Sequence, residues 1–182
     1  MKRFSPSAEA ICSALVEALG FALPGEGRVL EVGSGTGQHL VALARRYPRL
    51  VWIPSDADAD ARASIEARRS ETGMENLLPA LRLDTRYEPW PIDKVDVVLA
   101  VRVVDGAPWE ACEALFAGAA RRLSPGGRLL VCGPYAANGA SIPEWGVTEP
   151  GLLHALATGV GLVAAGEYSV APGLALFEYR AP

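Results

Sequence analysis

The chain has 182 residues, of which half are hydrophobic, and its formal net charge is −4. That length suits one domain over residues 1–182, large enough to bury about 70% of its unfolded surface. Its apolar runs are shorter than the ~20 residues that cross a membrane, and no signal-peptide core follows Met1, so we expect a cytoplasmic protein that does not bind a membrane. The arginines are scattered along the chain, so we expect no nucleic-acid partner.

The cysteines and histidines indicate neither disulfides nor a metal site. Cys12, Cys112 and Cys132 are far apart and lie in apolar contexts, as expected of small core residues. The chain has only two histidines, and neither is spaced from a cysteine or from the other histidine as the ligands of a metal site are. We therefore expect no bound metal.

The first predicted elements are a helix, a strand and a second helix. Ser5-Pro6 is a typical helix start, and apolar residues then repeat on one face as far as Gly20, where the helix should stop. The uninterrupted apolar run 29–32 predicts a short strand that is buried on both faces. A helix should follow from Gln38 and end near residue 47, before a proline.

Between this strand and helix lies the run E-V-G-S-G-T-G, which begins at Glu31. A dinucleotide fingerprint would need its third glycine at Gln38, and a phosphate-binding P-loop would need a Gly-Lys pair that is absent. The acid at the strand end favours a ligand that carries positive charge and no phosphate. S-adenosylmethionine (SAM) fits that description. An ordinary tight strand-to-helix turn is the alternative.

The second predicted strand covers residues 50–54 and leads to a cluster of acids. Asp56 lies 19 residues after Gly37, close to the ~20-residue offset at which an acid bonds ribose hydroxyls. Asp58 is the competing candidate, although acids are favoured at a helix start without any functional role. A helix over 59–72 should stop at Gly73.

The remaining elements complete an alternating strand and helix pattern. Residues 77–83 and 95–101 read as the third and fourth strands, and a helix follows Pro108. A turn over 124–127 should lead into a fifth strand over 128–132. A short helix over 151–158 then precedes an antiparallel hairpin formed by 162–169 and 174–180.

Two of these runs, E-V-G-S-G-T-G and L-S-P-G-G-R-L-L-V from Leu123, resemble class I SAM-dependent methyltransferases. The resemblance implies an α/β, Rossmann-like fold with a seven-stranded, mostly parallel sheet, helices on both faces and a C-terminal antiparallel hairpin. It also implies SAM as cofactor, S-adenosylhomocysteine as product and a small-molecule acceptor. Motifs and resemblance together predict these cofactor-binding residues: Glu31, Gly33, Ser34, Gly35, Gly37, Asp56, Ala57, Asp84, Thr85 and Val101. For Asp84, a turn-forming role is an equal alternative to contact with the adenine amine.

A narrower resemblance is to the uncharacterised methyltransferase-like twenty-six group and its bacterial relatives. It rests on S-P-S-A-E from Ser5, L-E-V-G-S-G-T-G-Q-H from Leu30 and P-S-D-A-D-A-D-A-R-A-S-I from Pro54. That group usually has Asn and His where this chain has Arg102 and Asp105, and Arg-Asn at positions 10–11, where this chain has Ala-Ile. Its polar segment before the Trp-Gly landmark is also longer. The residues expected to bind the cofactor, the glycine turn and Asp56, match that group, whereas the three differences lie on the side where a substrate would bind.

The candidates for catalysis and substrate contact lie on that differing side. Asp105, on the loop after the fourth strand, is the best-placed general base, with an ordinary Asp-Gly turn as the alternative. Tyr135 is a candidate for orienting the substrate, and His39 is a candidate substrate contact or base. Trp109 and Trp145 could wall an acceptor pocket or simply pack in the core.

The sequence leaves three functional hypotheses open. The first is a SAM-dependent methyltransferase, and the second is a SAM-binding protein that no longer methylates. The third is an enzyme that uses SAM in a different reaction. The methyl acceptor and the oligomeric state are not indicated by any motif.

Overall fold

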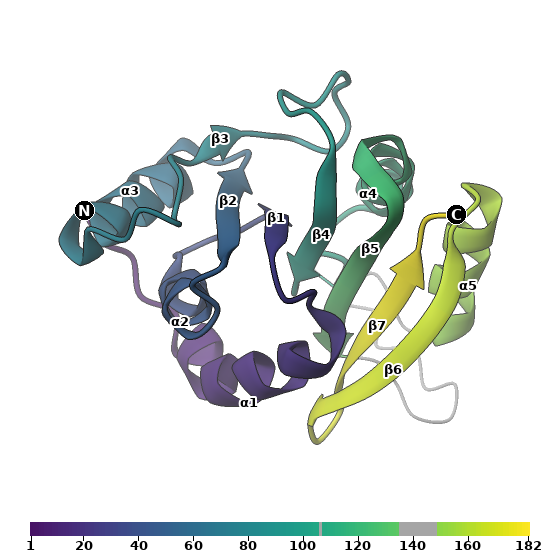
Figure 1. Ribbon diagram of the computed structural model, residues 1–182, viewed down its shortest axis with the longest axis horizontal. Coiled ribbons are helices and arrows are strands. Elements are labelled where there is room, and N and C mark those ends of the chain that lie inside the picture. The colour runs from purple at the N-terminus through teal and green to yellow at the C-terminus, as the bar shows by residue number, and fades with distance from the viewer. Residues whose placement is uncertain (106, 135–148) are drawn as a thin grey trace.

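The computed structural model describes residues 1–105, 107–134 and 149–182. The elements alternate as α1 (Pro6–Ala22), β1 (Gly27–Val32), α2 (Gln38–Arg46), β2 (Leu50–Asp56), α3 (Ala59–Thr72), β3 (Leu81–Arg82), β4 (Val95–Val101), α4 (Trp109–Arg122), β5 (Leu123–Pro134), α5 (Pro150–Gly159), β6 (Val163–Ala171) and β7 (Leu174–Arg180). Figure 1 shows the strands side by side in one twisted sheet. The seven-stranded α/β fold predicted from the sequence is confirmed.

The sheet has the order β3-β2-β1-β4-β5-β7-β6. The strands from β1 to β5 run parallel, and β7 pairs antiparallel with both β5 and β6, as the predicted closing hairpin requires. The chain leaves β1 toward β2 on one side and later returns to β4 on the other. Such a reversal in strand order opens a crevice at the carboxyl ends of the strands, where ligands bind in open α/β sheets.

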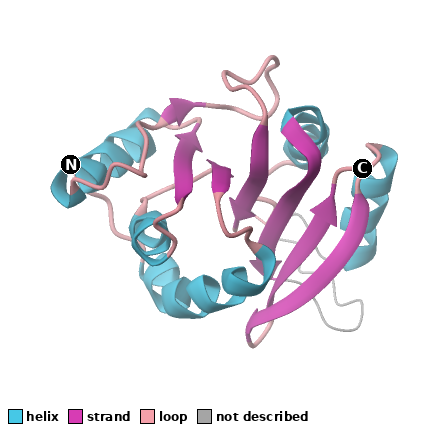
Figure 2. Ribbon diagram, viewed as in Figure 1, coloured by secondary structure: helices cyan, strands magenta, loops and turns pink. Residues whose placement is uncertain are grey.

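Helices cover both faces of the sheet (Figure 2). An apolar core on each face holds them against it. One core packs α1, α2 and α3 through residues such as Leu19, Leu43 and Ile65. The other packs α4 and α5, with Phe116 and Leu153 fully buried. The apolar run of β1 is buried on both sides because its residues alternate between these two cores.

Three predicted boundaries are wrong, each for a local reason. Helix α1 continues past Gly20 to Ala22, because Leu19 and Ala22 are fully buried and this packing outweighs the helix-breaking tendency of glycine. Strand β3 is only two residues long, since Pro79 has no N–H to donate to the sheet. The predicted turn at 124–127 is an irregularity inside β5, which begins at Leu123 and resumes its register at Arg128.

In the described parts of the chain, no helix combines the length and the apolar character needed to cross a membrane. Cys112 and Cys132 are buried and Cys12 is partly exposed, and all three are free thiols. Among the same residues, no group of three metal-ligating side chains comes together.

Candidate functional site

Two adjoining hollows lie at the carboxyl ends of the central strands. The larger hollow, of about 530 Å³, is lined by the ends of β1 and β2, the loops after β3 and β4, and the start of α4. The smaller hollow, of about 250 Å³, lies between the start of α1, the turn after β1 and the end of β4. Gly33 and Arg102 line both hollows, so the two form one continuous candidate site.

The turn after β1 depends on glycine for its shape. Gly33 and Gly37 both have left-handed backbones, with φ of 69° and 74°. A Cβ on Gly33 would lie 2.8 Å from Val103 Cγ2, and one on Gly37 would lie 3.1 Å from Ile65 Cγ1. The turn can therefore pass close to its neighbours only as bare backbone, which leaves its inner side open to the hollows. Ser34 and Gly35 also line the smaller hollow.

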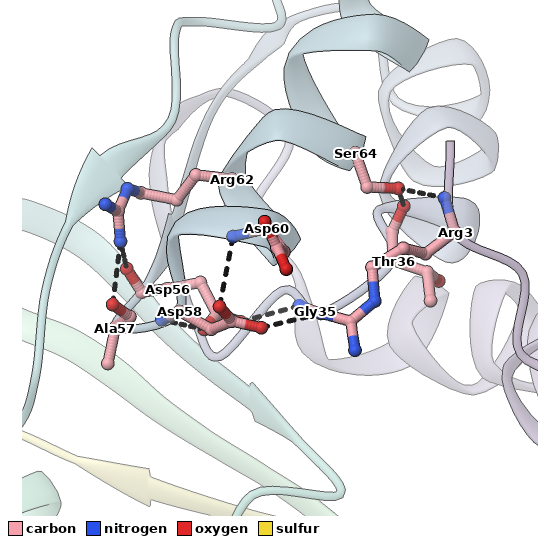
Figure 3. A network of polar contacts seen from close by, with 9 residues as sticks. All are labelled: Arg3, Gly35, Thr36, Asp56, Ala57, Asp58, Asp60, Arg62 and Ser64. Atoms are coloured by element: carbon pink, nitrogen blue, oxygen red, sulfur yellow. Dashed lines mark hydrogen bonds and ion pairs between the residues drawn. The ribbon is translucent and has the colours of Figure 1, made fainter. Parts of the chain in front are cut away.

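Asp56 ends β2 at the wall of the larger hollow, beside the glycine turn (Figure 3). Its Oδ2 accepts the N–H of Gly35 at 2.9 Å, and its Oδ1 accepts the N–H of Asp58 at 2.9 Å. Each carboxylate oxygen has two lone pairs, so both remain able to accept a further hydrogen bond. Ala57, the next residue, lines the same hollow.

Asp58, the competing acid, has a structural task. It caps α3 by accepting the N–H of Asp60 at 3.0 Å, and its other oxygen contacts Arg3 Nη1 at 2.6 Å. These hydrogen bonds, with that of Asp60 the strongest influence, lower the pKa of Asp58. Asp58 does not line either hollow.

Asp84 and Thr85 form the far wall of the larger hollow. Both carboxylate oxygens of Asp84 pair with Arg86, at 3.0 and 2.7 Å, and this hydrogen bonding lowers the pKa of Asp84. Thr85 is largely buried, and its hydroxyl donates to the carbonyl of Ala111 in α4 at 3.1 Å. The indole of Trp90 donates to the Thr85 carbonyl at 3.3 Å and so supports this wall from the core.

Glu31 does not line either hollow; it reaches the site through His39. The Glu31 side chain is fully buried, and its Oε1 lies 2.6 Å from His39 Nε2. Burial lowers the pKa of His39, but the charge and hydrogen bond of Glu31 outweigh it and raise that pKa overall. His39 lines the smaller hollow, as its predicted place at the start of α2 suggested. Sequence reasoning missed this pair, although an acid at the strand end and a histidine at the helix start were both visible.

Gln38, which replaces the third glycine of a dinucleotide fingerprint, ties the N-terminal segment to the turn. Its Oε1 accepts the N–H of Ser5 at 2.6 Å and the hydroxyl of Thr36 at 3.0 Å. Its amide nitrogen donates to Glu9 Oε2 at 2.8 Å. The start of α1 thereby becomes one wall of the smaller hollow.

Arg102 follows Val101, which lines the smaller hollow at the end of β4. Among the described residues it is the one non-glycine with a positive φ, 57°, a conformation that costs about 1–3 kcal/mol. Its N–H donates to the Cys132 carbonyl at 2.8 Å, and its Nε donates to Asp105 Oδ2 at 2.6 Å. Asp105 is 3% exposed and lies behind the guanidinium rather than on a hollow wall.

Of the remaining predicted residues, Trp109 does not line either hollow. Trp109 begins α4, packs against the core and donates its indole N–H to Glu113 at 3.0 Å. Tyr135 and Trp145 lie outside the described residues. Sequence reasoning did not propose Arg102 as a site residue, although a cation directly after the fourth strand was a usable signal.

Comparison with known proteins finds methyltransferases. The O-methyltransferase VdtC of Byssochlamys spectabilis is 24% identical over 156 residues, which are 85% of this chain. The chain spans only about a third of the length of its first curated relatives, 28% of one and 35% of the other.

Solved structures share the fold. The S-adenosylmethionine-dependent methyltransferase SibL superposes with a TM-score of 0.80 at 20% identity, covering 97% of this chain and 56% of that one. A SAM-dependent methyltransferase from Aquifex aeolicus superposes with a TM-score of 0.76 at 16% identity, covering 98% of this chain and 94% of that one. The fold is thus the Rossmann-like methyltransferase fold.

A family profile matches residues 2–148, more than half of the chain. The chain therefore belongs to the family described as "Protein of unknown function (DUF938)".

Proposed function

We propose that this chain is a SAM-dependent methyltransferase that acts on a small molecule. The observation that carries the proposal is the carboxylate of Asp56 on the wall of the larger hollow, next to a glycine turn that has no lysine for phosphate. A carboxylate there suits ribose hydroxyls and disfavours a nucleotide phosphate at the same place. The SAM-dependent methyltransferases that share the fold support this reading.

The residues present fit SAM. Asp56 would hold the ribose, while Ala57, Asp84 and Thr85 would surround the adenine in the larger hollow. The sulfur-bearing part of SAM would lie along the glycine turn and extend into the smaller hollow beside Val101. That turn runs from Gly33 to Gly37 and includes Ser34 and Gly35. Glu31 would act through His39, to which it is paired. A Cβ at Gly33 would displace Val103, so the turn keeps its close approach only with glycine there.

SAM supplies an activated methyl group, and the protein must align an acceptor with it and exclude water. Alignment of this kind lowers a reaction barrier by several kcal/mol. The N-terminal segment, held by Gln38 over the turn, covers one side of the smaller hollow and limits access of water there. The curated relatives are named O-methyltransferases, so hydroxyl-bearing small molecules are the first acceptors to test.

The catalytic and substrate roles of Asp105, Tyr135, His39, Trp109 and Trp145 stay predictions. The position of Asp105 behind Arg102 favours a positioning role over that of a general base, because its Oδ2 is paired with Arg102 and its carboxylate is enclosed away from both hollows. The sequence also leaves a second function open, a SAM-binding protein that does not methylate. Cofactor binding without turnover on hydroxylated acceptors would indicate that second function.

Four narrower statements also stay predictions: a single domain over residues 1–182, a cytoplasmic location, the absence of nucleic-acid partners, and membership of the methyltransferase-like twenty-six group.

The proposal is tested by calorimetric titration with SAM and S-adenosylhomocysteine. We expect binding in the micromolar range and a loss of about tenfold or more in Asp56→Asn, because a charge-assisted hydrogen bond is worth about 1.5–3 kcal/mol. Asp58→Asn is the matched control, since that acid caps α3 and does not line the hollows. Binding of NADH without binding of SAM would refute the proposal, and unchanged affinity in Asp56→Asn would show that the wrong acid was chosen.

A further inference from the structure

Among the residues that the structure describes, Arg102 is the one charged side chain that lines both hollows. Two contacts fix it: its backbone N–H donates to the Cys132 carbonyl, and its Nε donates to Asp105. A left-handed backbone at a residue other than glycine is strained and persists where surrounding contacts impose it. The chain therefore holds this guanidinium at the junction of the two hollows rather than leaving it to swing in solvent.

The fixed geometry leaves the outer edge of the guanidinium available. Nε of Arg102 donates to the Asp105 carboxylate. Asp105 is only 3% exposed, so a ligand in the hollows cannot displace Arg102 from it. Neither Nη of Arg102 donates to any group in the described parts of the chain. A planar guanidinium with two free, parallel N–H donors matches the geometry of a carboxylate.

The rest of the smaller hollow suits an anion as well. His39 lines it, and the paired Glu31 raises the pKa of that imidazole and so favours its charged form. The balancing carboxylate of Glu31 is fully buried behind the ring and does not line the hollow. The hydroxyls of Ser5 and Ser7 also line the hollow; they are hydrogen-bonded to each other at 2.9 Å, which leaves one O–H as an uncharged donor.

We infer that Arg102 binds the carboxylate of the amino-acid part of SAM in the smaller hollow, and that Asp105 positions its guanidinium for this contact. The inference rests on the proposed function. The carboxylate is assigned to the cofactor rather than to the methyl acceptor because the smaller hollow, of about 250 Å³, opens directly on the glycine turn. The amino-acid part of SAM is attached to the ribose, and with the ribose beside Asp56 it would reach the smaller hollow along that turn.

The test compares two ligands that differ only in the amino-acid part. S-adenosylhomocysteine carries the carboxylate, whereas 5′-deoxy-5′-methylthioadenosine keeps the adenosine and the sulfur and lacks it. Calorimetry on Arg102→Gln should show affinity for S-adenosylhomocysteine reduced about tenfold to a hundredfold, with affinity for the thioadenosine changed by no more than about twofold. Arg49→Gln removes the same charge at the other end of the sheet and should leave both affinities unchanged.

Two further variants keep the test decisive if Arg102→Gln does not fold. Arg102→Lys retains the charge and loses the planar fork, so it should weaken S-adenosylhomocysteine selectively but less than Arg102→Gln. Asp105→Asn should also reduce affinity for S-adenosylhomocysteine more than for the thioadenosine, because it loosens the guanidinium. A purely structural role would weaken both ligands alike.

Each outcome is informative. Equal loss of both ligands, or full retention of S-adenosylhomocysteine binding in Arg102→Gln, would overturn the inference. Failure of the unaltered protein to bind either ligand would overturn the proposed function itself. The two failures are thus distinguishable.

Discussion

Gly118 in α4 should resist substitution by alanine, against the usual preference of helices. Alanine is favoured over glycine inside a helix by about 1 kcal/mol. Gly118 is buried, however, and a Cβ there would overlap Cζ2 and Cε2 of the Trp90 ring and lie 2.7 Å from its Cη2. Trp90 is 2% exposed and cannot move aside without disturbing the core around it.

Overpacking of this kind typically costs about 1–3 kcal/mol, and an overlap with a buried ring belongs at the upper end. After the gain in helix propensity, Gly118→Ala should lose about 2 kcal/mol of unfolding free energy. For a chain of this size that corresponds to a fall of about 4–8 °C in Tm. Because the Trp90 indole supports the Thr85 carbonyl, affinity for S-adenosylhomocysteine should fall as well.

Thermal and urea unfolding of Gly118→Ala measure this effect. Gly151→Ala in α5 is the control, since a Cβ there meets no atom within 4 Å and stability should be unchanged or slightly higher. The double variant Gly118→Ala with Trp90→Phe should be less destabilised than the sum of the single changes, because the smaller ring makes room for the methyl group. A Gly118→Ala protein as stable as the unaltered one would refute the packing described here.

Three further predictions follow from the site and the cores. The Glu31 contact raises the pKa of His39, so the stability that this contact contributes should be full below pH ~6.5 and be lost as the pH rises through the raised pKa. The difference in unfolding free energy between the unaltered protein and His39→Gln should therefore shrink with rising pH. Growth of that difference would contradict the assignment. Burial raises the pKa of Cys112 to about 11 and that of Cys132 to about 12, so iodoacetamide at pH 8 should label them only after unfolding, as mass spectrometry can determine. Asp84→Asn should weaken S-adenosylhomocysteine binding about threefold to tenfold in calorimetry, because the adenine amine would then donate to a neutral oxygen in place of a charged one, and unchanged affinity would assign Asp84 to the turn alone.

The sequence predicted the strand and helix order because both depend on local patterns. The apolar runs at 29–32 and 95–101 and the glycines after β1 mark buried strands and a left-handed turn, and these features need no knowledge of distant residues. Asp56 was predicted in the same way, from its place at a strand end. The short β3 was missed because the effect of one proline depends on which strand lies beside it.

The contacts inside the site were harder to predict because they join segments that are distant in sequence. The amide of Gln38 bonds Ser5, and the buried Glu31 pairs with His39, but neither choice of partner is encoded in a local pattern. The left-handed backbone of Arg102 is still less visible, since it depends on Cys132 in the neighbouring strand. Sequence reasoning therefore named residues that line the two hollows, such as Asp56 and Gly33, but missed the pairing of Glu31 with His39.

The ion pair between Arg102 and Asp105 constrains how this loop can change during evolution. Loss of the arginine alone would leave an enclosed carboxylate without its cation, and loss of the aspartate alone would leave the guanidinium without the ion pair that holds it in place. Either single step carries a penalty that the paired exchange avoids. Homologues should therefore keep both residues or replace both, so that the two positions covary in an alignment.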